Sequence, residues 1–369
     1  MDILFLNWKD LKNPDVGGAE IIIYEMAKRL VAEGHTVTWF CRSFPGGAQH
    51  DEYDGIRIVR RGNLLSVYWQ AYMYYRSLSK KPDRVVDCIN TICWQTPLYV
   101  PASVRVMLVN QLAKEVFFYE LPFPLSWLAY ALERLEYLTY KTTRIVCYAD
   151  STKKDLMTFG LPEKNISIFP LGLDHGRYRV GTKSKDPLFV FVARMARMKR
   201  PDLCVEAMSI VAKSYPRARL AIIGYGPMEQ YIAKRIVQLN LTTSIELVNK
   251  NALYFSKNVK DKKVWYMQKA WALLLPSVKE GWGMVVTEAA SCGTPSIVTD
   301  VTGLKDSVQH DRTGIHISSS PTKEELADAM IRIIENSTLR TSLSLLAERM
   351  ARSYTWESSY KSFARLLES

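Results

Sequence analysis

The sequence has few of the residues and runs that mark several common functional classes. It holds five histidines and six cysteines in 369 residues, and no two cysteines form a C-x-x-C pair. This spacing supports neither a zinc site nor a disulfide framework, so the cysteines are expected to be buried thiols in a reducing compartment. No run reaches the roughly 18 apolar residues that a membrane-spanning helix needs.

Two further absences concern metal ions and targeting. The sequence has no strict D-x-D motif, and its few histidines are not clustered. We therefore expect no metal ion and no other cofactor. The first apolar run, Ile3–Leu6, has the pattern of a strand and lacks the basic and then apolar pattern of a signal segment. We expect a cytoplasmic protein, and peripheral contact with the membrane remains open.

Charge is distributed unevenly along the chain. The formal net charge is +12, but the first 175 residues hold 20 basic and 19 acidic side chains. Almost all of the excess therefore lies in the second half. Basic proteins bind phosphorylated ligands, anionic membranes or nucleic acid. No K/R-rich repeat or nucleic-acid motif accompanies the charge, so nucleic acid is not expected as a partner.

The first residues have the pattern of a βαβ unit. A strand over residues 1–8 is followed by Gly17, Gly18, Ala19 and Glu20, which begin an amphipathic helix that ends at Gly34, and by a strand over Val37–Phe40. This order predicts an α/β fold with a doubly wound parallel sheet. The G-x-G-x-x-G loop and the following acid of dinucleotide enzymes are missing, which disfavours hydride transfer. The two glycines either allow close approach of a ligand or only form a tight turn.

Two stretches of the first half, residues 66–75 and 116–140, are rich in aromatic side chains. Between Leu125 and Tyr140 the apolar residues recur at the spacing of an amphipathic helix, at Trp127, Leu128, Ala131, Leu132, Leu135 and Leu138. This stripe either packs into the core or forms a surface that faces a membrane or a lipid acceptor.

The most informative stretch is Leu273–Asp300. It predicts a buried strand over Ala272–Leu275, a loop over Lys279–Gly283, a helix from Met284 to Cys292 that Gly293 ends, and a strand over Pro295–Val298. The first turn of that helix carries no acidic side chain, so its free N–H groups suit a phosphate.

Two carboxylates, Glu280 and Glu288, flank this predicted phosphate site. Carboxylates repel phosphate but accept hydrogen bonds from hydroxyl groups. A phosphate flanked by two polyols is the chemistry of a nucleotide sugar.

A basic loop follows another apolar strand, Leu188–Ala193. It contains Arg194, Arg197, Lys199 and Arg200. Ligands in open α/β sheets bind beyond the carboxyl ends of strands, and clustered cations repel one another unless an anion lies among them. We expect Arg197 and Arg200 to face solvent.

The segment Glu280–Glu288, with Gly281 and Gly283 between the glutamates and C-G-T-P closing it from Cys292, resembles the E-x7-E motif of glycosyltransferase family 4. These are retaining nucleotide-sugar glycosyltransferases, also grouped as glycosyl transferases group 1. The resemblance implies the GT-B fold, in which two Rossmann-like domains face a cleft. We expect residues 1–175 to bind the acceptor, residues 186–352 to bind the donor, and a helix over 353–369 to cross back to the first domain.

The resemblance also implies roles for individual residues. Arg194 and Lys199 match its R-x4-K pair, which holds the donor diphosphate and stabilises the leaving nucleoside diphosphate. Glu280 would hold the hydroxyls of the donor sugar and Glu288 the ribose. The catalytic residues would be Glu280, Arg194 and Lys199. The other candidate donor-binding residues are Glu288, Gly281, Trp282, Gly283, Met284, Val285, Gly224, Gly17 and Gly18, and Asn110 and Glu20 would line the cleft or contact the acceptor.

Some positions depart from the family pattern or remain open. Many members have a histidine after the strand at Val104–Val109, where this chain has Asn110, whose side chain does not titrate and could act only through hydrogen bonds. Gly224 begins a G-x-G-P turn that is fully explained as a turn. Residues 249–263 either contact the base or form an ordinary loop.

The sequence therefore predicts transfer of a sugar to the hydroxyl of a glycan, polyprenyl or glycolipid acceptor in cell-surface glycan or glycolipid synthesis. Two other functions remain open. An epimerase on the same fold would consume donor without an acceptor and would need acid and base side chains. A protein that only binds nucleotide sugars or anionic lipids would show no turnover.

Overall fold

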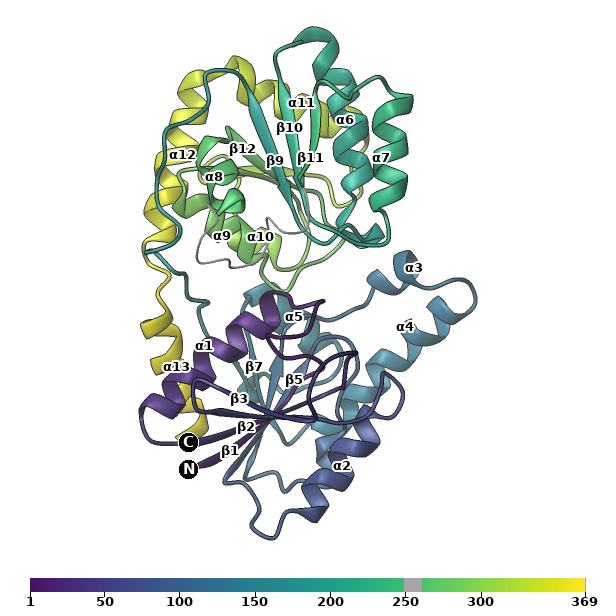
Figure 1. The fold of residues 1–369 in the computed structure, drawn as a ribbon, viewed down its shortest axis with the longest axis vertical. Helices are drawn as coiled ribbons and strands as arrows, with labels where there is room; N and C mark the ends of the chain where they lie inside the picture. Colours follow the sequence, from purple (N-terminus) through teal and green to yellow (C-terminus); the bar gives the residue numbers. More distant parts are fainter. Residues whose placement is uncertain (249–260, 369) are drawn as a thin grey trace. The chain divides into compact units, whose positions relative to one another are not determined.

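The computed structural model describes residues 1–248 and 261–368. The chain divides into two compact units (Figure 1). The first contains Met1–Lys114, Trp127–Gly172 and Trp356–Ser369, and the second contains Glu115–Ser126 and Leu173–Thr355. Residue 369 and residues 249–260, which are part of the segment 249–263 considered for contact with the base, lie outside the described residues.

The first unit is built on an eight-stranded sheet with the order β3-β4-β2-β1-β5-β6-β7-β8. Its strands pair in parallel except β3 with β4, which are antiparallel. The strands are β1 (Asp2–Leu6), β2 (Thr36–Cys41), β3 (His50–Tyr53), β4 (Ile56–Arg60), β5 (Arg84–Ile89), β6 (Arg105–Val109), β7 (Arg144–Cys147) and β8 (Ile166–Ile168). The helices are α1 (Gly18–Ala32), α2 (Val67–Ser77), α4 (Leu125–Glu136, of which the first two residues belong to the second unit), α5 (Asp150–Thr158) and α13 (Trp356–Glu368).

The second unit has a fully parallel six-stranded sheet with the order β11-β10-β9-β12-β13-β14. Its strands are β9 (Leu188–Val192), β10 (Arg219–Ile223), β11 (Ile245–Val248), β12 (Ala272–Leu275), β13 (Ser296–Thr299) and β14 (Gly314–Ile317). Its helices are α3 (Val116–Glu120), α6 (Pro201–Ser214), α7 (Glu229–Gln238), α8 (Lys262–Lys269), α9 (Met284–Ser291), α10 (Leu304–Ser307), α11 (Lys323–Glu335) and α12 (Ser337–Ala351).

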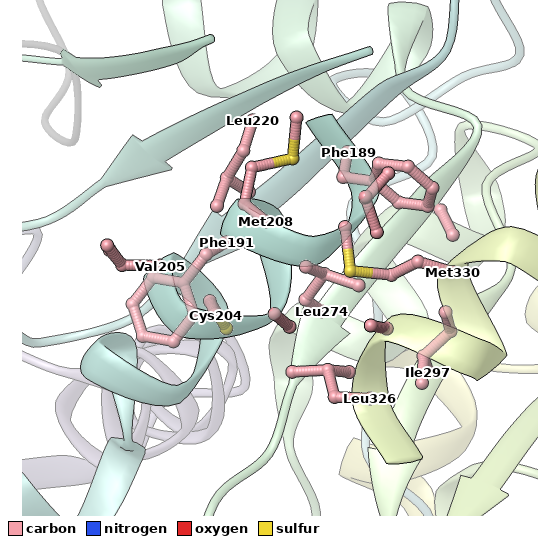
Figure 2. Close-up of a cluster of buried hydrophobic side chains, with 14 of the residues drawn as sticks. Phe189, Phe191, Cys204, Val205, Met208, Leu220, Leu274, Ile297, Leu326 and Met330 are labelled. Atoms are coloured by element: carbon pink, nitrogen blue, oxygen red, sulfur yellow. The ribbon is translucent and has the colours of Figure 1, made fainter. Parts of the chain in front are cut away.

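Alternate residues of each buried strand in the second unit enter different cores. Phe189 and Phe191 of β9 pack with Met208 of α6 and Met330 of α11 (Figure 2). Val190 and Val192 point to the other face and pack in a second cluster with residues of α8, α9 and α12. Both faces of the sheet are thus covered, which is why β9 has an uninterrupted apolar sequence. The predicted doubly wound α/β fold is confirmed.

The C-terminal helix α13 packs against the first unit. Its Phe363 stacks on Phe5 of β1 with ring centroids 6.2 Å apart, and Ser359 Oγ donates to the carbonyl of Pro170 at 2.5 Å. Trp356 covers Gly172, where an added Cβ would lie 2.4 Å from the indole. The glycine at this position therefore lets the helix approach the chain closely.

All six cysteines are free and buried, as expected. Within the described part of the chain, no helix has the length and apolar character needed to cross a membrane.

The helix predicted around Leu125–Tyr140 is present, but its apolar stripe does not pack into the core. Trp127, Leu128, Leu132, Leu135 and Leu138 are all exposed. Core packing of this stripe was therefore the wrong alternative. The reason is that polar side chains of the same helix, Glu133 and Glu136, bond to the backbone beneath it.

Gly224 is required by close packing of two loops. A Cβ added there would lie 2.0 Å from the carbonyl oxygen of Ala193. We predict that Gly224→Ala lowers the free energy of unfolding by about 1–3 kcal/mol, as overpacking typically does. Urea denaturation measures this. In Gly176→Ala the added Cβ meets only the end of the Asp174 side chain at 3.2 Å, so this control should lose much less, and equal losses would contradict the packing argument.

Candidate functional site

The predicted site residues of the second unit lie where the strand order of the sheet reverses. β9 is central, β10 and β11 follow on one side, and β12, β13 and β14 lie on the other. The chain therefore turns to one side of the sheet after β9 and to the other side after β12, and the two loops begin at the carboxyl ends of these neighbouring strands. Such a reversal point is the usual ligand site of an open α/β sheet.

The loop after β9 is held by the turn after β10. The N–H of Met195 donates to the carbonyl of Tyr225 at 2.8 Å, and the carbonyl of Met195 accepts from the N–H of Met228 at 2.9 Å. A Cβ at Gly226 would lie 2.7 Å from the carbonyl oxygen of Met195. The G-x-G-P turn thus positions the basic loop, which gives Gly224 and Gly226 a structural role.

The loop after β12 is fixed on two sides. The N–H of Val278 donates to the carbonyl of Met198 at 2.8 Å, which joins it to the basic loop. The N–H of Glu280 donates to the carbonyl of Thr302 at 3.3 Å. Gly303 has a φ of +82°, and a Cβ there would lie 2.4 Å from the carbonyl oxygen of Glu280. These contacts set the direction of the Glu280 side chain.

An ion pair connects the two loops. Lys199 Nζ lies 2.6 Å from Glu280 Oε1, and the two side chains are only 14% and 13% exposed. Ser277 Oγ donates to the same carboxylate oxygen at 2.9 Å. The structure therefore brings together two of the three predicted catalytic residues.

The helix α9 begins directly after this loop. Gly283 is its N-cap residue with a φ of +79°, and no side chain of the described residues caps it. The first turn contains Met284 and Val285 and no acidic residue. A helix N-terminus of this kind carries a partial positive charge and favours an anion.

Glu288 lies further along α9 and is buried. Its Oε1 accepts a hydrogen bond from Tyr178 at 2.8 Å, and its Oε2 lies 2.6 Å from Lys263 Nζ. Burial, together with the charge of Glu288, raises the pKa of Tyr178 well above its ordinary value. The carboxylate is thus held in place by Tyr178, which the sequence analysis did not identify, and by Lys263, the last residue of the segment 249–263.

The remaining predicted residues of this unit differ in environment. Arg194 is exposed beyond β9. Trp282 is buried against Tyr354 with ring centroids 5.7 Å apart, and its Nε1 has no hydrogen-bond partner among the described residues. Arg197 is exposed as expected. The expectation for Arg200 was wrong, because its guanidinium donates to the hydroxyl of Tyr119 at 2.7 Å and lies over that ring.

The candidates in the first unit also lie beyond the carboxyl ends of central strands. Glu20 is buried and accepts from the N–H of Gly17 at 2.7 Å and from Asn7 Nδ2 at 3.1 Å. It therefore closes the first turn of α1, and Gly18 is the first residue of that helix. Asn110 accepts from the hydroxyl of Tyr148 at 2.5 Å, while its Nδ2 is buried without a partner among the described residues.

Two family models match the chain. Residues 177–350 match the model "Glycosyl transferases group 1" and residues 16–177 match "Glycosyltransferase Family 4". The chain is a family 4 glycosyltransferase. The transferase is 25% identical over 96% of its length to the mannosylfructose-phosphate synthase of Agrobacterium fabrum, of which the match covers 87%. It is 27% identical to the D-inositol 3-phosphate glycosyltransferase of Rhodococcus erythropolis over 54% of this chain and 47% of that protein.

Solved structures agree on the fold. The sucrose-phosphate synthase of Thermosynechococcus elongatus superposes with a TM-score of 0.80 at 17% identity, covering all of this transferase and 98% of that chain. HepE from Anabaena, solved with UDP-glucose, has a TM-score of 0.73 at 16% identity and covers all of the transferase and 99% of that chain. The fold of the transferase is therefore GT-B, as the resemblance implied.

Within residues 1–248 and 261–368, no group of three or more histidine, cysteine, aspartate and glutamate side chains has a geometry that could hold a metal ion. The cations that the structure places at the candidate site are lysine and arginine side chains.

The contact between Glu288 and Lys263 is expected to stabilise the donor-binding unit. Removing one partner of a largely buried pair leaves the other charge uncompensated, at a cost of about 3–5 kcal/mol. We predict that Lys263→Met lowers the free energy of unfolding substantially and that Lys263→Met combined with Glu288→Gln lowers it less. Urea denaturation of the wild type, the two single variants and the double variant gives the four free energies of unfolding of a double-mutant cycle. Additive losses would contradict coupling of the two side chains.

Proposed function

We propose that the transferase is a retaining, metal-independent hexosyltransferase that moves a sugar from a nucleotide-diphosphate sugar to an acceptor hydroxyl. The observation that carries this proposal is the largely buried Lys199–Glu280 pair beside the N-terminus of α9, which no side chain of the described residues caps. It places a cation, an acceptor of hydroxyl hydrogen bonds and an anion-binding helix end within one pair of loops.

The donor diphosphate would bind among positive groups. Lys199 and the exposed Arg194 leave the end of β9, and the N–H groups of Met284 and Val285 begin α9. Arginine suits bidentate contact with phosphate, and lysine supplies a point charge. As the bond to the sugar breaks, negative charge grows on the leaving diphosphate. Groups fixed before the reaction stabilise this charge without the cost of reorganisation.

The sugar and the ribose would contact the two glutamates. Glu280 has one oxygen paired with Lys199, and its carboxylate has further capacity to accept hydrogen bonds from sugar hydroxyls. Glu288 is held by Tyr178 and Lys263, and it would accept from the ribose. The phosphate would bind between these two polyols.

In the reaction, the bond between the anomeric carbon of the sugar and the diphosphate oxygen breaks, and a bond between the same carbon and the acceptor oxygen forms. The acceptor loses its proton, which a donor phosphate oxygen would take. The nucleoside diphosphate leaves with that proton. Retention of the anomeric configuration would follow from attack on the face that the diphosphate leaves.

The comparisons support a nucleotide-sugar donor, because HepE was solved with UDP-glucose. For the acceptor we propose a glycan or a lipid-linked hydroxyl compound. The names of the two relatives point to phosphorylated small molecules as a second acceptor class.

The carboxylate of Glu280 is expected to be essential for turnover. We predict that Glu280→Ala lowers kcat by about a hundredfold or more, because it removes a fixed polar group at the reacting centre. The assay measures kcat as release of nucleoside diphosphate from a panel of nucleotide sugars. Hexose phosphates, inositol phosphates and lipid extracts serve as acceptors. Ser277→Ala removes only a hydrogen bond to Glu280 and should cost far less. Near-normal turnover of a folded Glu280→Ala protein would contradict the assignment, and donor conversion without any acceptor would favour the epimerase alternative.

Charge compensation by Lys199, Arg194 and α9 predicts that turnover needs no divalent ion. Incubation with EDTA, followed by assay in EDTA, should leave the rate unchanged. A loss of rate that magnesium restores would overturn the metal-independent mechanism.

A further inference from the structure

The helix α4 of the first unit has an unusual distribution of side chains. Its polar groups face the protein: Glu133 is 2% exposed and accepts from the N–H groups of Ala113 at 2.6 Å and Lys114 at 2.7 Å. Glu136 accepts from the N–H of Cys93 at 2.9 Å. The polar face of this amphipathic helix is therefore bound to the protein, and its apolar face points outward.

The outward face of α4, continued by Leu138 in the short 3-10 turn that follows it, is made of large apolar and aromatic residues. Between Trp127 and Leu138 they are 38–59% exposed, namely Trp127, Leu128, Tyr130, Leu132, Leu135 and Leu138. Monomeric soluble proteins seldom leave so many neighbouring apolar side chains in water. Such a face indicates a partner surface.

The apolar surface extends to helix α2 through the loop at residues 95–99. Gln95 Nε2 donates to the carbonyl of Glu136 at 3.3 Å, and Tyr99 packs edge-on against Tyr72 of α2 with centroids 5.5 Å apart. Exposed side chains also follow this path, namely Leu98 in the loop and Leu65, Trp69 and Met73 at α2. The two helices and the loop thus form one surface, which we call the α2–α4 surface.

The charge on this surface is of one sign. Residues 64–77 contain no acidic side chain, and residues 127–141 contain only Glu133 and Glu136, which both face inward. Arg76, Arg134 and Lys141 are exposed on the same segments. A second copy of the chain would bring these cations toward one another, whereas an anionic lipid surface complements them.

We propose that the α2–α4 surface docks the transferase onto an anionic phospholipid bilayer. The leucines would enter the boundary between headgroups and acyl chains, as the apolar face of an interfacial helix does. Trp69, Trp127 and Tyr130 have the amphipathic rings that favour this boundary. Arg76, Arg134 and Lys141 would pair with lipid phosphates. The proposal rests on the first unit alone and does not depend on donor chemistry.

Sedimentation of the full chain with vesicles tests this surface. Vesicles of phosphatidylglycerol and phosphatidylcholine should bind the protein, and pure phosphatidylcholine vesicles should bind it more weakly. We expect Leu128→Ser combined with Leu135→Ser to lower the partition coefficient by about tenfold or more, since each change removes apolar area that the bilayer would bury. Arg134→Gln combined with Lys141→Gln should remove most of the preference for phosphatidylglycerol.

The matched control is Val237→Ser combined with Leu345→Ser, which changes two exposed apolar residues of the second unit and should leave binding unchanged. Wild-type protein that does not sediment, or leucine variants that bind as well as wild type, would overturn the proposal. Light scattering gives the oligomeric state. If the wild type does not bind vesicles and is a dimer that the leucine changes convert to a monomer, the surface binds a second copy of the chain and the proposal is overturned. Thermal shift with UDP, measured on the same variants, reports donor binding separately and should not change.

Discussion

The ion pair between Lys199 and Glu280 is the interaction on which the candidate site depends. Its two residues leave neighbouring strands at the point where the sheet order reverses, and a backbone bond between Val278 and Met198 holds the same two loops together. The close packing at Gly224 and Gly303 leaves the loops little freedom. The site is therefore shaped before a donor binds, which is the condition for electrostatic stabilisation of a leaving group.

The two units place polar groups in opposite ways. In the second unit, carboxylates and cations form largely buried pairs, one between two loops and one between helices α8 and α9, and the N-terminus of α9 has no side-chain cap among the described residues. In the first unit, the carboxylates of α4 satisfy backbone N–H groups and turn the apolar side chains of that helix outward. One arrangement suits a small charged ligand, and the other suits an extended apolar surface.

Much of the fold followed from the sequence because its signals are local. The uninterrupted apolar run at Leu188–Ala193 marks a central strand, and Gly293 marks the end of a helix; both elements were predicted within two residues of their observed ends. The sequence also identified Lys199 and Glu280 as candidate site residues, and the structure pairs these two side chains. The contacts of Tyr178 and Lys263 with Glu288 could not be predicted, because these two residues lie 110 and 25 positions away from it in the sequence. The direction of the α4 stripe was equally hidden, since periodicity gives the apolar face but not the side on which the protein lies.

The most direct test of the donor site is calorimetric titration of UDP and other nucleoside diphosphates into the wild type, Lys199→Ala and Arg197→Ala. Both changes remove one positive charge from the same loop, but only Lys199 is paired with Glu280 at the reversal point. Loss of a charged hydrogen bond should weaken binding of the preferred diphosphate by about ten- to a hundredfold in Lys199→Ala, with little change in Arg197→Ala. Equal affinities in all three proteins, or no binding of any nucleoside diphosphate at millimolar concentration, would contradict the account.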